Sequence, residues 1–569
     1  MIQKLFRSKP GIVYLLAALV ALNFLAAIFH YRLDLTREKR FTLSAPTKKL
    51  LRNLDDKIQI TVFLEGELPA GFRKLRNSTD ELLREFKENG GSSIQYQFQK
   101  IGDGLDDADK AAFLDSMARL GIKPYTVKVQ AKADEGNEER QVVPGALITY
   151  KGRPLAINLL SGQMTGSLDE ATINSTEALL EYKFAHAIQK VSTEELPAVG
   201  YLLGNGETFS PNIKSLVETV LMPNYEFRFL PIDSFPLIPL NFDALLIMKP
   251  TIPFREDQKL KIDQYIMHGG KVIWLVDRLY AEMDSLLRKQ SDFVAFDRNL
   301  NIEDQLFKYG VRINPDLVQD LQCDKFPLVV GSVGDQPQID LVDWPYFPLL
   351  DPQPTNPITS NLGKVLSVFP NSVDTIKTPG IKKTILLTGS ANGRSLVTPA
   401  IVSFNSVKTE EDLKTFNKSH IPIAVLLEGN FPSLYSNRLT QSYQDSLKTV
   451  YNQPFRSASM ATKMVVISDA DIVSNVVTQQ EGPLEMGVNQ FTKATYANKD
   501  FMLNTIEYLV NPSGIMETRA KDYTLRLLDP KKLEASRNNW TLINIGLPIL
   551  LVVVFGLVFQ TLRRRKYNR

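Results

Sequence analysis

The chain has 569 residues, 44% hydrophobic and 23% charged, an ordinary globular composition that excludes a disordered chain, a collagen and a many-helix membrane transporter. Lys and Arg number 66 against 63 Asp and Glu, and the resulting net charge of +3 argues against a dedicated nucleic-acid binder. The single cysteine, Cys323, excludes an internal disulfide, and four histidines leave few candidates for metal or triad chemistry.

Two apolar segments, one near each end of the chain, are long enough to cross a membrane. Residues 12–29 contain one polar residue, Asn23, and residues 542–562 are followed directly by the basic cluster 563–566. A spanning helix needs about 20 apolar residues. Because no small-residue cleavage site follows the first segment, we expect an uncleaved anchor there in preference to a signal peptide. The sequence therefore predicts a transmembrane helix at each end.

Two spans place both termini on one side of the membrane. Because a basic cluster beside a span marks the cytoplasmic side, residues 563–566 predict cytoplasmic termini and a periplasmic segment 31–540 in an inner-membrane protein. Polar residues within the spans are costly in lipid unless they are paired. Asn23, Asn544 and Gln560 are therefore candidate contacts with other membrane helices. The alternatives are an Asn23–Asn544 pair and a headgroup position for Gln560.

Residues 57–191 predict an α/β domain. Strand patterns cover 57–64, 94–101, 125–130 and 146–150, and helical patterns cover 72–87, 106–120 and 175–190. This β-α-β-α-β-β-α order resembles a thioredoxin-like fold, in which Pro144, or equally Pro124, takes the place of the cis-proline that precedes a strand. The charged stretch 131–140 is expected to separate two strands. Since no CxxC motif occurs, the domain is expected to bind or to act as a spacer and not to exchange disulfides.

Residues 195–515 predict a second α/β domain. Apolar strands are expected at 198–203, 225–230, 244–248, 271–276, 384–387, 423–427 and 464–467, with helices at 213–221, 255–267 and 500–510. Strands that alternate with helices predict a mostly parallel, doubly wound, Rossmann-like sheet, a class that includes the glutamine amidotransferases. Cys323 does not lie on a strand-to-helix elbow, so this amidotransferase-like domain is expected to be non-catalytic and Cys323 to be a structural thiol.

The proline-rich insertion 327–379 interrupts the second domain and holds nine of the chain's 32 prolines. Proline is excluded from helix interiors and central strands, so we expect a long irregular segment. Trp344 and Tyr346 on this segment are candidate exposed residues of a partner surface. The slightly favoured alternative is a packed crossover above the sheet. The polar segments 405–420 and 432–460 are expected to be mobile.

Polar residues at the predicted strand ends are the candidate ligand residues. Ligands of α/β sheets bind beyond the carboxyl ends of the strands. This places Asn205 and Glu207, Asp277, and the pair Asp469 and Asp471 at possible sites, and the last pair is able to hold a divalent cation. The favoured alternative is that each turn only caps the next helix. Since neither a GxxxxGK[ST] motif nor a GxSxG elbow occurs, no catalytic residue, cofactor or resident metal is expected.

Several long motifs are specific enough to indicate a family. They are Arg40-Phe-Thr-Leu-Ser44, Val62 to Phe72, Asp263 to Gly270, Leu306 to Pro315, Val342 to Pro348 and Leu525 to Asp529. Together they resemble the GldG family, the gliding-motility-associated ABC-transporter auxiliary proteins of Bacteroidota. Two positions depart from the family pattern: Asn205 stands where His is common, and Ala470 stands where Gly is common. Both departures weaken any catalytic interpretation of these turns.

The resemblance implies a non-enzymatic auxiliary subunit that joins a polytopic permease and a cytoplasmic ATPase needed for gliding. Its outer domains are expected to bind substrate or an envelope partner, without a cofactor. One alternative is a mechanical scaffold of the motility or secretion apparatus. A second is an amidotransferase-like envelope hydrolase.

The predicted segments follow one another in a simple order. They are a cytoplasmic tail at 1–10, a transmembrane helix at 11–30, a linker at 31–56, the thioredoxin-like domain at 57–191, the doubly wound domain at 195–515, a juxtamembrane segment at 516–540, a transmembrane helix at 541–562 and a basic cytoplasmic tail at 563–569.

Overall fold

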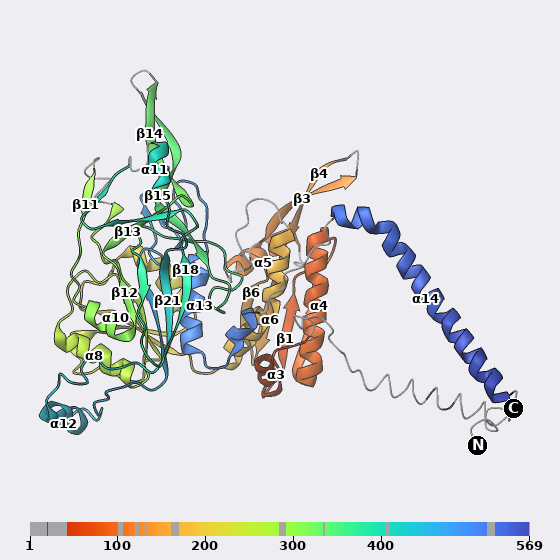
Figure 1. Ribbon diagram of the computed structural model, residues 1–569, viewed down its shortest axis with the longest axis horizontal. Helices are drawn as coiled ribbons and strands as arrows, with labels where there is room; N and C mark the ends of the chain where they lie inside the picture. Colours follow the sequence, from red (N-terminus) through yellow and green to blue (C-terminus); the bar gives the residue numbers. More distant parts are fainter. Residues whose placement is uncertain are drawn as a thin grey trace. The chain divides into compact units, whose positions relative to one another are not determined.

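The computed structural model describes most of the chain between its two ends. The described residues are 42–100, 106–119, 122, 124–132, 135–160, 170–283, 292–333, 336–404, 409–520 and 530–567, with Ala17 and Val20 in addition. The chain divides into two compact units, residues 1–522 and 523–569 (Figure 1). The predicted first span, with Asn23, lies outside the described residues apart from Ala17 and Val20.

The first sheet is mixed and has four strands in the order β2-β1-β5-β6. Their bounds are β1 Ile58–Val62, β2 Ile94–Phe98, β5 Gly145–Tyr150 and β6 Arg153–Asn158. β1 pairs parallel with β2 and antiparallel with β5, which pairs antiparallel with β6. The helices of this part are α3 Ala45–Arg52, α4 Ala70–Gly90, α5 Asp107–Arg119 and α6 Glu170–Ser192. Apolar residues of α3, α4 and α6 share one core with the sheet, and α4 and α6 lie side by side (Figure 1).

Two predictions for this region are wrong. The charged stretch 131–140 does not separate two strands of the sheet, because it belongs to a separate hairpin of β3 Tyr125–Lys132 and β4 Glu135–Val142 (Figure 1). A hairpin satisfies its backbone groups by itself, so a charged sequence is able to form strands away from a core. Pro144 does not follow a cis bond, since Thr398–Pro399 is the cis peptide bond of the described residues. The bond before Pro124 lies outside them.

The second sheet has ten strands, nine of them in the order β14-β15-β18-β21-β22-β10-β9-β7-β8, with β16 paired to β15. The parallel half consists of β7 Ala198–Leu203, β8 Glu226–Pro231, β9 Ala244–Met248, β10 Lys271–Leu275 and β22 Thr462–Ile467. The antiparallel half consists of β14 Cys323–Val333, β15 Gln336–Pro352, β16 Val365–Leu366, β18 Ile381–Thr388 and β21 Pro422–Gly429. The predicted strands are present. The prediction that the sheet is mostly parallel is wrong for its antiparallel half.

Helices cover both faces of this sheet. On one face, α13 Asn498–Val510 and the π-helix η3 Val217–Leu221 share a core with the strands. On the other, α8 Glu256–Met267 and α10 Glu303–Tyr309 do so. Neighbouring residues of one strand belong to different cores, as Leu245 and Leu246 of β9 do. A strand buried on both faces is apolar throughout, which explains the unbroken apolar sequence of β9.

The proline-rich insertion contains regular strand, contrary to the prediction. β14 and β15 form a long hairpin that extends beyond the rest of the sheet (Figure 1). β14 lies at the edge of the sheet, and the second pairing of β15, with β16 and β18, covers only Leu349 to Pro352. Most of the hairpin therefore has a free edge, where the missing N–H of proline is tolerated. Pro327 pairs with Leu341 in this ladder, and register shifts interrupt the pairing near Cys323 and Val329.

Short elements complete the first unit. Paired strands are β11 Phe293–Ala295 with β20 Ala400–Val402, β12 Val311–Ile313 with β17 Val373–Thr375, β13 Asp316–Asp320 with β19 Gly393–Val397, and β23 Val477–Thr478 with β24 Gly482–Pro483. Short helices are η1 Gly91–Ser93, η2 Pro211–Ile213, α7 Lys214–Leu216, η4 Ile232–Ser234, α11 Glu410–Lys414, α12 Gln441–Thr449 and η5 Ile515–Ala520. Helix α12 and the buried residues Leu434 and Tyr435 order much of 432–460.

The second unit is dominated by one long helix, α14 Pro530–Tyr567 (Figure 1). Its stretch Ile543–Arg565 contains an 18-residue segment with a mean hydropathy of 2.4 and is long and apolar enough to cross a membrane. This stretch coincides with the predicted second span. Asn544 and Gln560 are exposed on it, as are its apolar side chains.

Candidate ligand-binding site

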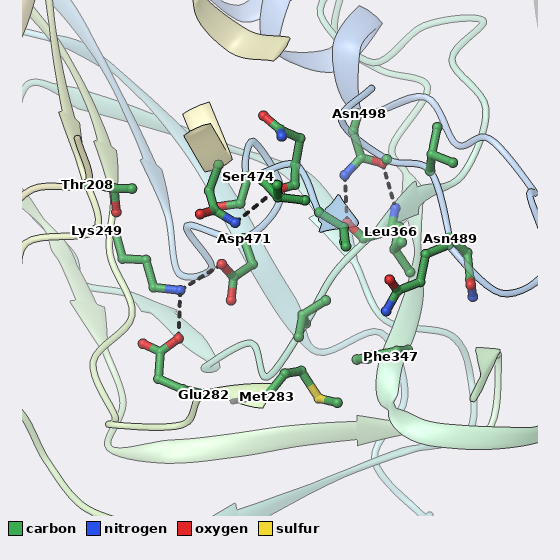
Figure 2. Close-up of a pocket in the computed structure, with 18 of the residues that line it drawn as sticks. Thr208, Lys249, Glu282, Met283, Phe347, Leu366, Asp471, Ser474, Asn489 and Asn498 are labelled. Carbon is green, nitrogen blue, oxygen red and sulfur yellow. Dashed lines mark hydrogen bonds and ion pairs between the residues drawn. The ribbon is translucent and has the colours of Figure 1, made fainter. Parts of the chain in front are cut away.

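A cavity of about 1100 Å³ opens where several parallel strands of the second sheet end. Thr208 follows β7, Lys249 follows β9 directly, and Asp471 follows β22, and all three line the cavity (Figure 2). Strands that run parallel bring their carboxyl ends to one edge, where the backbone leaves the sheet and side chains converge. The cavity therefore lies where this fold class places its ligands.

Lys249 is the centre of the charged wall of the cavity. Its Nζ lies 2.7 Å from Asp471 Oδ1, 3.2 Å from Glu282 Oε2 and 3.2 Å from Asp277 Oδ2. Figure 2 shows the ammonium directed at Asp471 and Glu282. Arg298 donates to the other oxygen of Glu282 at 2.6 Å, so a second cation supports the cluster. These five charged residues come from four loops, which follow β9, β10, β11 and β22.

The backbone of Lys249 is fixed at a strained position. Its φ of 50° is left-handed, which is uncommon for a residue with a Cβ. Its N–H donates to Leu275 O at 2.8 Å, so the residue continues the ladder between β9 and β10. Burial opposes the charge of Lys249, but the carboxylates of Asp471, Asp277 and Glu282 outweigh it and hold the pKa of Lys249 well above its ordinary value.

The carboxylates around Lys249 are themselves desolvated. Burial raises the pKa of Asp277 and of Glu282, while Lys249 opposes that rise. Asp277 Oδ1 also accepts from the N–H of Ala470 at 2.6 Å. This contact joins the end of β10 to the end of β22.

Asp469 is a structural residue and not part of the cavity wall. Its Oδ2 accepts from the Val368 N–H at 2.8 Å and from the Ser367 hydroxyl, and its Oδ1 accepts from the Asp471 N–H at 2.7 Å. Burial raises the pKa of Asp469 well above its ordinary value, and the nearby carboxylates of Asp471 and Asp277 add to the rise.

A divalent cation between Asp469 and Asp471 is not supported. The ammonium of Lys249 already lies against Asp471, and the oxygens of Asp469 point to protein donors. Within the described ranges, no three His, Cys, Asp or Glu side chains are grouped so that they are able to hold a metal ion.

Asn205 and Glu207 lie in a separate turn after β7, outside the cavity lining. Glu207 Oε2 accepts from the backbone N–H groups of Gly204 at 2.9 Å and Asn205 at 2.7 Å. The Asn205 amide donates to Gln258 Oε1 at 2.8 Å. Burial raises the pKa of Glu207. These contacts close the turn on itself, while the next helix, η2, is capped by Ser210 and not by this turn. A ligand role for Asn205 and Glu207 stays a prediction.

Trp344 and Tyr346 are buried, at 1% and 0% exposure, so an exposed partner surface made of these aromatics is wrong. They belong to an aromatic cluster in which the Trp344 and Phe347 rings are 4.9 Å apart. Tyr346 donates to Ile401 O at 3.1 Å. The packed alternative describes these two residues better, because the hairpin folds its aromatic face onto neighbouring strands.

The apolar wall of the cavity was not predicted. Its members come from strands and loops far apart in the sequence and are Met283, Phe326, Phe347, Leu366, Val368, Val476, Val477, Val488 and Phe491. Amide side chains hold this wall in place: Asn498 bonds both backbone groups of Leu366, at 2.8 and 2.9 Å, and Asn489 donates to Asp324 at 2.7 Å (Figure 2). The cavity thus combines one ionic wall with one apolar wall.

Comparisons with known proteins identify a family for this chain. The family model described as an ABC-type uncharacterized transport system matches residues 196–505, and a domain of unknown function matches residues 37–149. A search of curated proteins found no match. One solved structure, described as the mmIFT52 N-terminal domain, is 12% identical and covers 55% of this chain and 97% of its own, with a TM-score of 0.30 that carries no argument about the fold. Since the first match spans more than half of the sequence, the chain belongs to the family of ABC-type transport-system auxiliary proteins.

Proposed function

We propose that the chain is a non-enzymatic, membrane-anchored auxiliary subunit of an ABC transport complex required for gliding motility, as in the GldG family of Bacteroidota. The observation that carries this proposal is the match over residues 196–505 on the same chain as the apolar helix Ile543–Arg565. Its partners are a polytopic permease and a cytoplasmic ATPase. A membrane span joined to a large binding domain suits a stable complex with a permease.

The two α/β parts are proposed to be a thioredoxin-like domain and a Rossmann-like domain. The strand order β2-β1-β5-β6, with a parallel first pair and antiparallel β5 and β6, supports the first assignment. Five parallel strands covered by helices on both faces support the second. The domain bounds remain 57–191 and 195–515.

We propose an inner-membrane location with both termini in the cytoplasm and residues 31–540 in the periplasm. The run Arg563-Arg564-Arg565-Lys566 directly behind the apolar stretch supports this orientation, because basic residues beside a span are retained on the cytoplasmic side.

The cavity is proposed to bind the transported substrate or an envelope partner. One ionic wall is able to orient a polar group, and one apolar wall is able to bury a hydrocarbon or ring, which is the usual composition of a ligand pocket. Asn489 and Asn498 hold the apolar wall and the ion pairs of Lys249 hold the ionic wall, and walls held in this way reduce the entropic cost of binding.

A hydrolase that uses Cys323 is the weaker alternative. Burial raises the pKa of the Cys323 thiol to about 12, and the carboxylates of Asp343, Asp320 and Asp324 add to the rise. The thiolate is the nucleophile, so a thiol that stays protonated at neutral pH is unreactive. Cys323→Ala is therefore expected to leave gliding intact, whereas a cysteine hydrolase would lose its function.

Purification of the intact chain from membranes in a mild detergent tests the proposal. The permease and the ATPase are expected to co-purify. The double variant Asn544→Leu/Gln560→Leu removes two exposed polar side chains of the apolar stretch and is expected to recover less of both partners, while Val553→Leu serves as the matched apolar control. Recovery of the chain alone in several mild detergents would refute a stable complex. Normal gliding without the permease would favour the mechanical scaffold.

A further inference from the structure

Strand β8 leaves one edge of the ten-stranded sheet open. It is the last strand in the sheet order, and among the described residues only β7 pairs with it. The Glu226 N–H donates to Pro197 O on the β7 side at 2.9 Å. Because successive residues of a strand alternate in direction, Phe227 and Phe229 direct their backbone N–H and C=O groups outward. The open edge therefore offers regularly spaced backbone partners to another strand.

An exposed aromatic patch lies on one face of this edge. Phe209 and Phe229 are 68% and 39% exposed, although large apolar side chains are usually buried. Their rings are 5.0 Å apart, and the Phe227 ring is 4.9 Å from that of Phe229. Open edges in stable monomers are commonly protected by charge, proline or a covering segment. β8 carries Glu226, Arg228 and Pro231, but the two charges neutralise each other, and the three phenylalanines that adjoin the edge are typical of a surface that is covered in an assembly.

The opposite face of β8 carries one charge of each sign. Glu226 and Arg228 are 51% and 60% exposed and pair with each other along the strand. Opposite charges two residues apart are self-complementary under a two-fold axis, because an antiparallel copy is able to place each charge against the other.

We propose that β8 is the contact through which two copies of this chain form a two-fold dimer, with the sheet continuing from one copy into the other. The occupant of the open edge is thus a second β8 in antiparallel orientation. Main-chain hydrogen bonds supply the pairing, as in other cases of strand addition at a sheet edge, and the aromatic patches of the two copies lie together on one face.

The charges select one register for this dimer. Only residues whose backbone N–H and C=O groups face outward are able to pair across the axis. Three registers are then open: Phe227 opposite Phe227 of the second copy, Phe227 opposite Phe229, and Phe229 opposite Phe229. The second register sets Arg228 against Arg228. The third sets Arg228 against Leu230, so no pair of opposite charges forms across the axis. The first register sets Glu226 against Arg228 of the second copy on both sides of the axis, and it is the one proposed.

A charge swap tests both the dimer and its register. Analytical ultracentrifugation of the full chain in detergent is expected to show a dimer. Glu226→Arg alone and Arg228→Glu alone each set like charges across the axis and are expected to weaken dimerisation at least tenfold. An equal mixture of the two single variants is expected to restore a dimer, because each variant then meets its opposite. Arg312→Glu, at an exposed arginine paired with Asp374 elsewhere, is the matched control and is expected to behave as wild type.

A second variant keeps the test independent of charge. Phe227→Cys sets two thiols opposite each other at a Cα separation of about 5.5 Å, within the range that a disulfide spans. Mild oxidation is expected to give a covalent dimer, and Val397→Cys, an exposed position on another strand, is expected to give none. A monomeric wild type, single swaps that dimerise normally, a mixture that fails to recover, or no Phe227→Cys dimer would each overturn the proposal. None of these results bears on the partnership with a permease.

Discussion

Lys249 holds the charged wall of the cavity together, since three carboxylates converge on its ammonium. Removing one partner from a buried ionic cluster leaves the remaining charges uncompensated, which commonly costs about 3–5 kcal/mol. We expect Lys249→Met to lower the free energy of unfolding by about that amount at pH 8, measured by urea denaturation. Lys493→Met, at an exposed lysine paired with Glu481, is the control and should stay within about 0.5 kcal/mol of wild type.

The pH dependence of this variant follows from the same cluster. Burial already raises the pKa of Asp277 and Glu282, and without the lysine nothing nearby opposes that rise as strongly. An acid with a raised pKa in the folded state contributes stability at low pH and loses it as pH rises. The deficit of Lys249→Met should therefore shrink between pH 8 and pH 5. A deficit independent of pH would show that lost packing, and not charge, causes it.

Glu507 makes the contact between α13 and α6 sensitive to acid. Burial opposes its ionisation, but His186 at 3.3 Å, Asn511 at 2.6 Å and Tyr225 at 3.3 Å outweigh it, so the pKa of Glu507 lies below its ordinary value of 4.5. Stability from this group is present above pH 4.5 and is lost as pH falls further. We expect Glu507→Gln to show a shallower loss of thermal stability below pH 4.5 than wild type. An identical slope would contradict the assignment.

The sequence indicated two carboxylates of the site, Asp277 and Asp471, but did not indicate their partner, Lys249. Asp277 and Asp471 follow apolar strands, and that position alone indicates the cavity edge. Lys249 also follows an apolar strand, but a lysine in that position is ordinarily solvated. Its burial depends on three other loops, and the sequence alone does not show that these loops meet. The apolar wall shared this difficulty, since Phe347 and Phe491 reach the same cavity only through tertiary packing, each against Phe326.

Strand β7 illustrates how closely the elements of the second sheet pack. A Cβ added at Gly200 would lie 2.8 Å from Leu245 and 3.1 Å from Phe242, too close for either to remain in place. Overpacking of this kind usually costs about 1–3 kcal/mol. Gly200→Ala is expected to lower the free energy of unfolding by that amount in urea titration. Gly331→Ala, on the hairpin and open to solvent, should differ from wild type by less than about 0.5 kcal/mol.

At the scale of elements, periodicity found the short apolar strands and the amphipathic helices. β1 and α4 share one core and β9 and α8 share another, and the apolar residues of each follow from that packing. Strand β3 was also predicted, but the charge of β4 and the prolines of β14 and β15 gave no sign of a strand, although β15 places Trp344 and Tyr346 in a buried cluster. The strands 384–387 and 423–427 were predicted, but their antiparallel direction was not, because a strand pattern in the sequence does not record direction.

For the molecule as a whole, we expect α14 to determine on which side of the membrane the C-terminus lies. A charged residue at the centre of a span costs about 2.5–3.5 kcal/mol on insertion. Val553 lies exposed in the middle of the apolar stretch. A fluorescent protein that folds only in the cytoplasm, fused after Arg569, is expected to fluoresce with the wild-type chain and with Val553→Leu. With Val553→Arg we expect a large loss of signal; equal signal from all three would contradict insertion of α14.

Native mass spectrometry of the complex purified from membranes through a tag on this chain tests the central proposal most directly. The account predicts one assembly that contains this chain, a polytopic permease and an ATPase, and the loss of both partners together when α14 no longer spans the membrane. A spectrum that shows only this chain, as one copy or as several, would contradict its role as an auxiliary subunit.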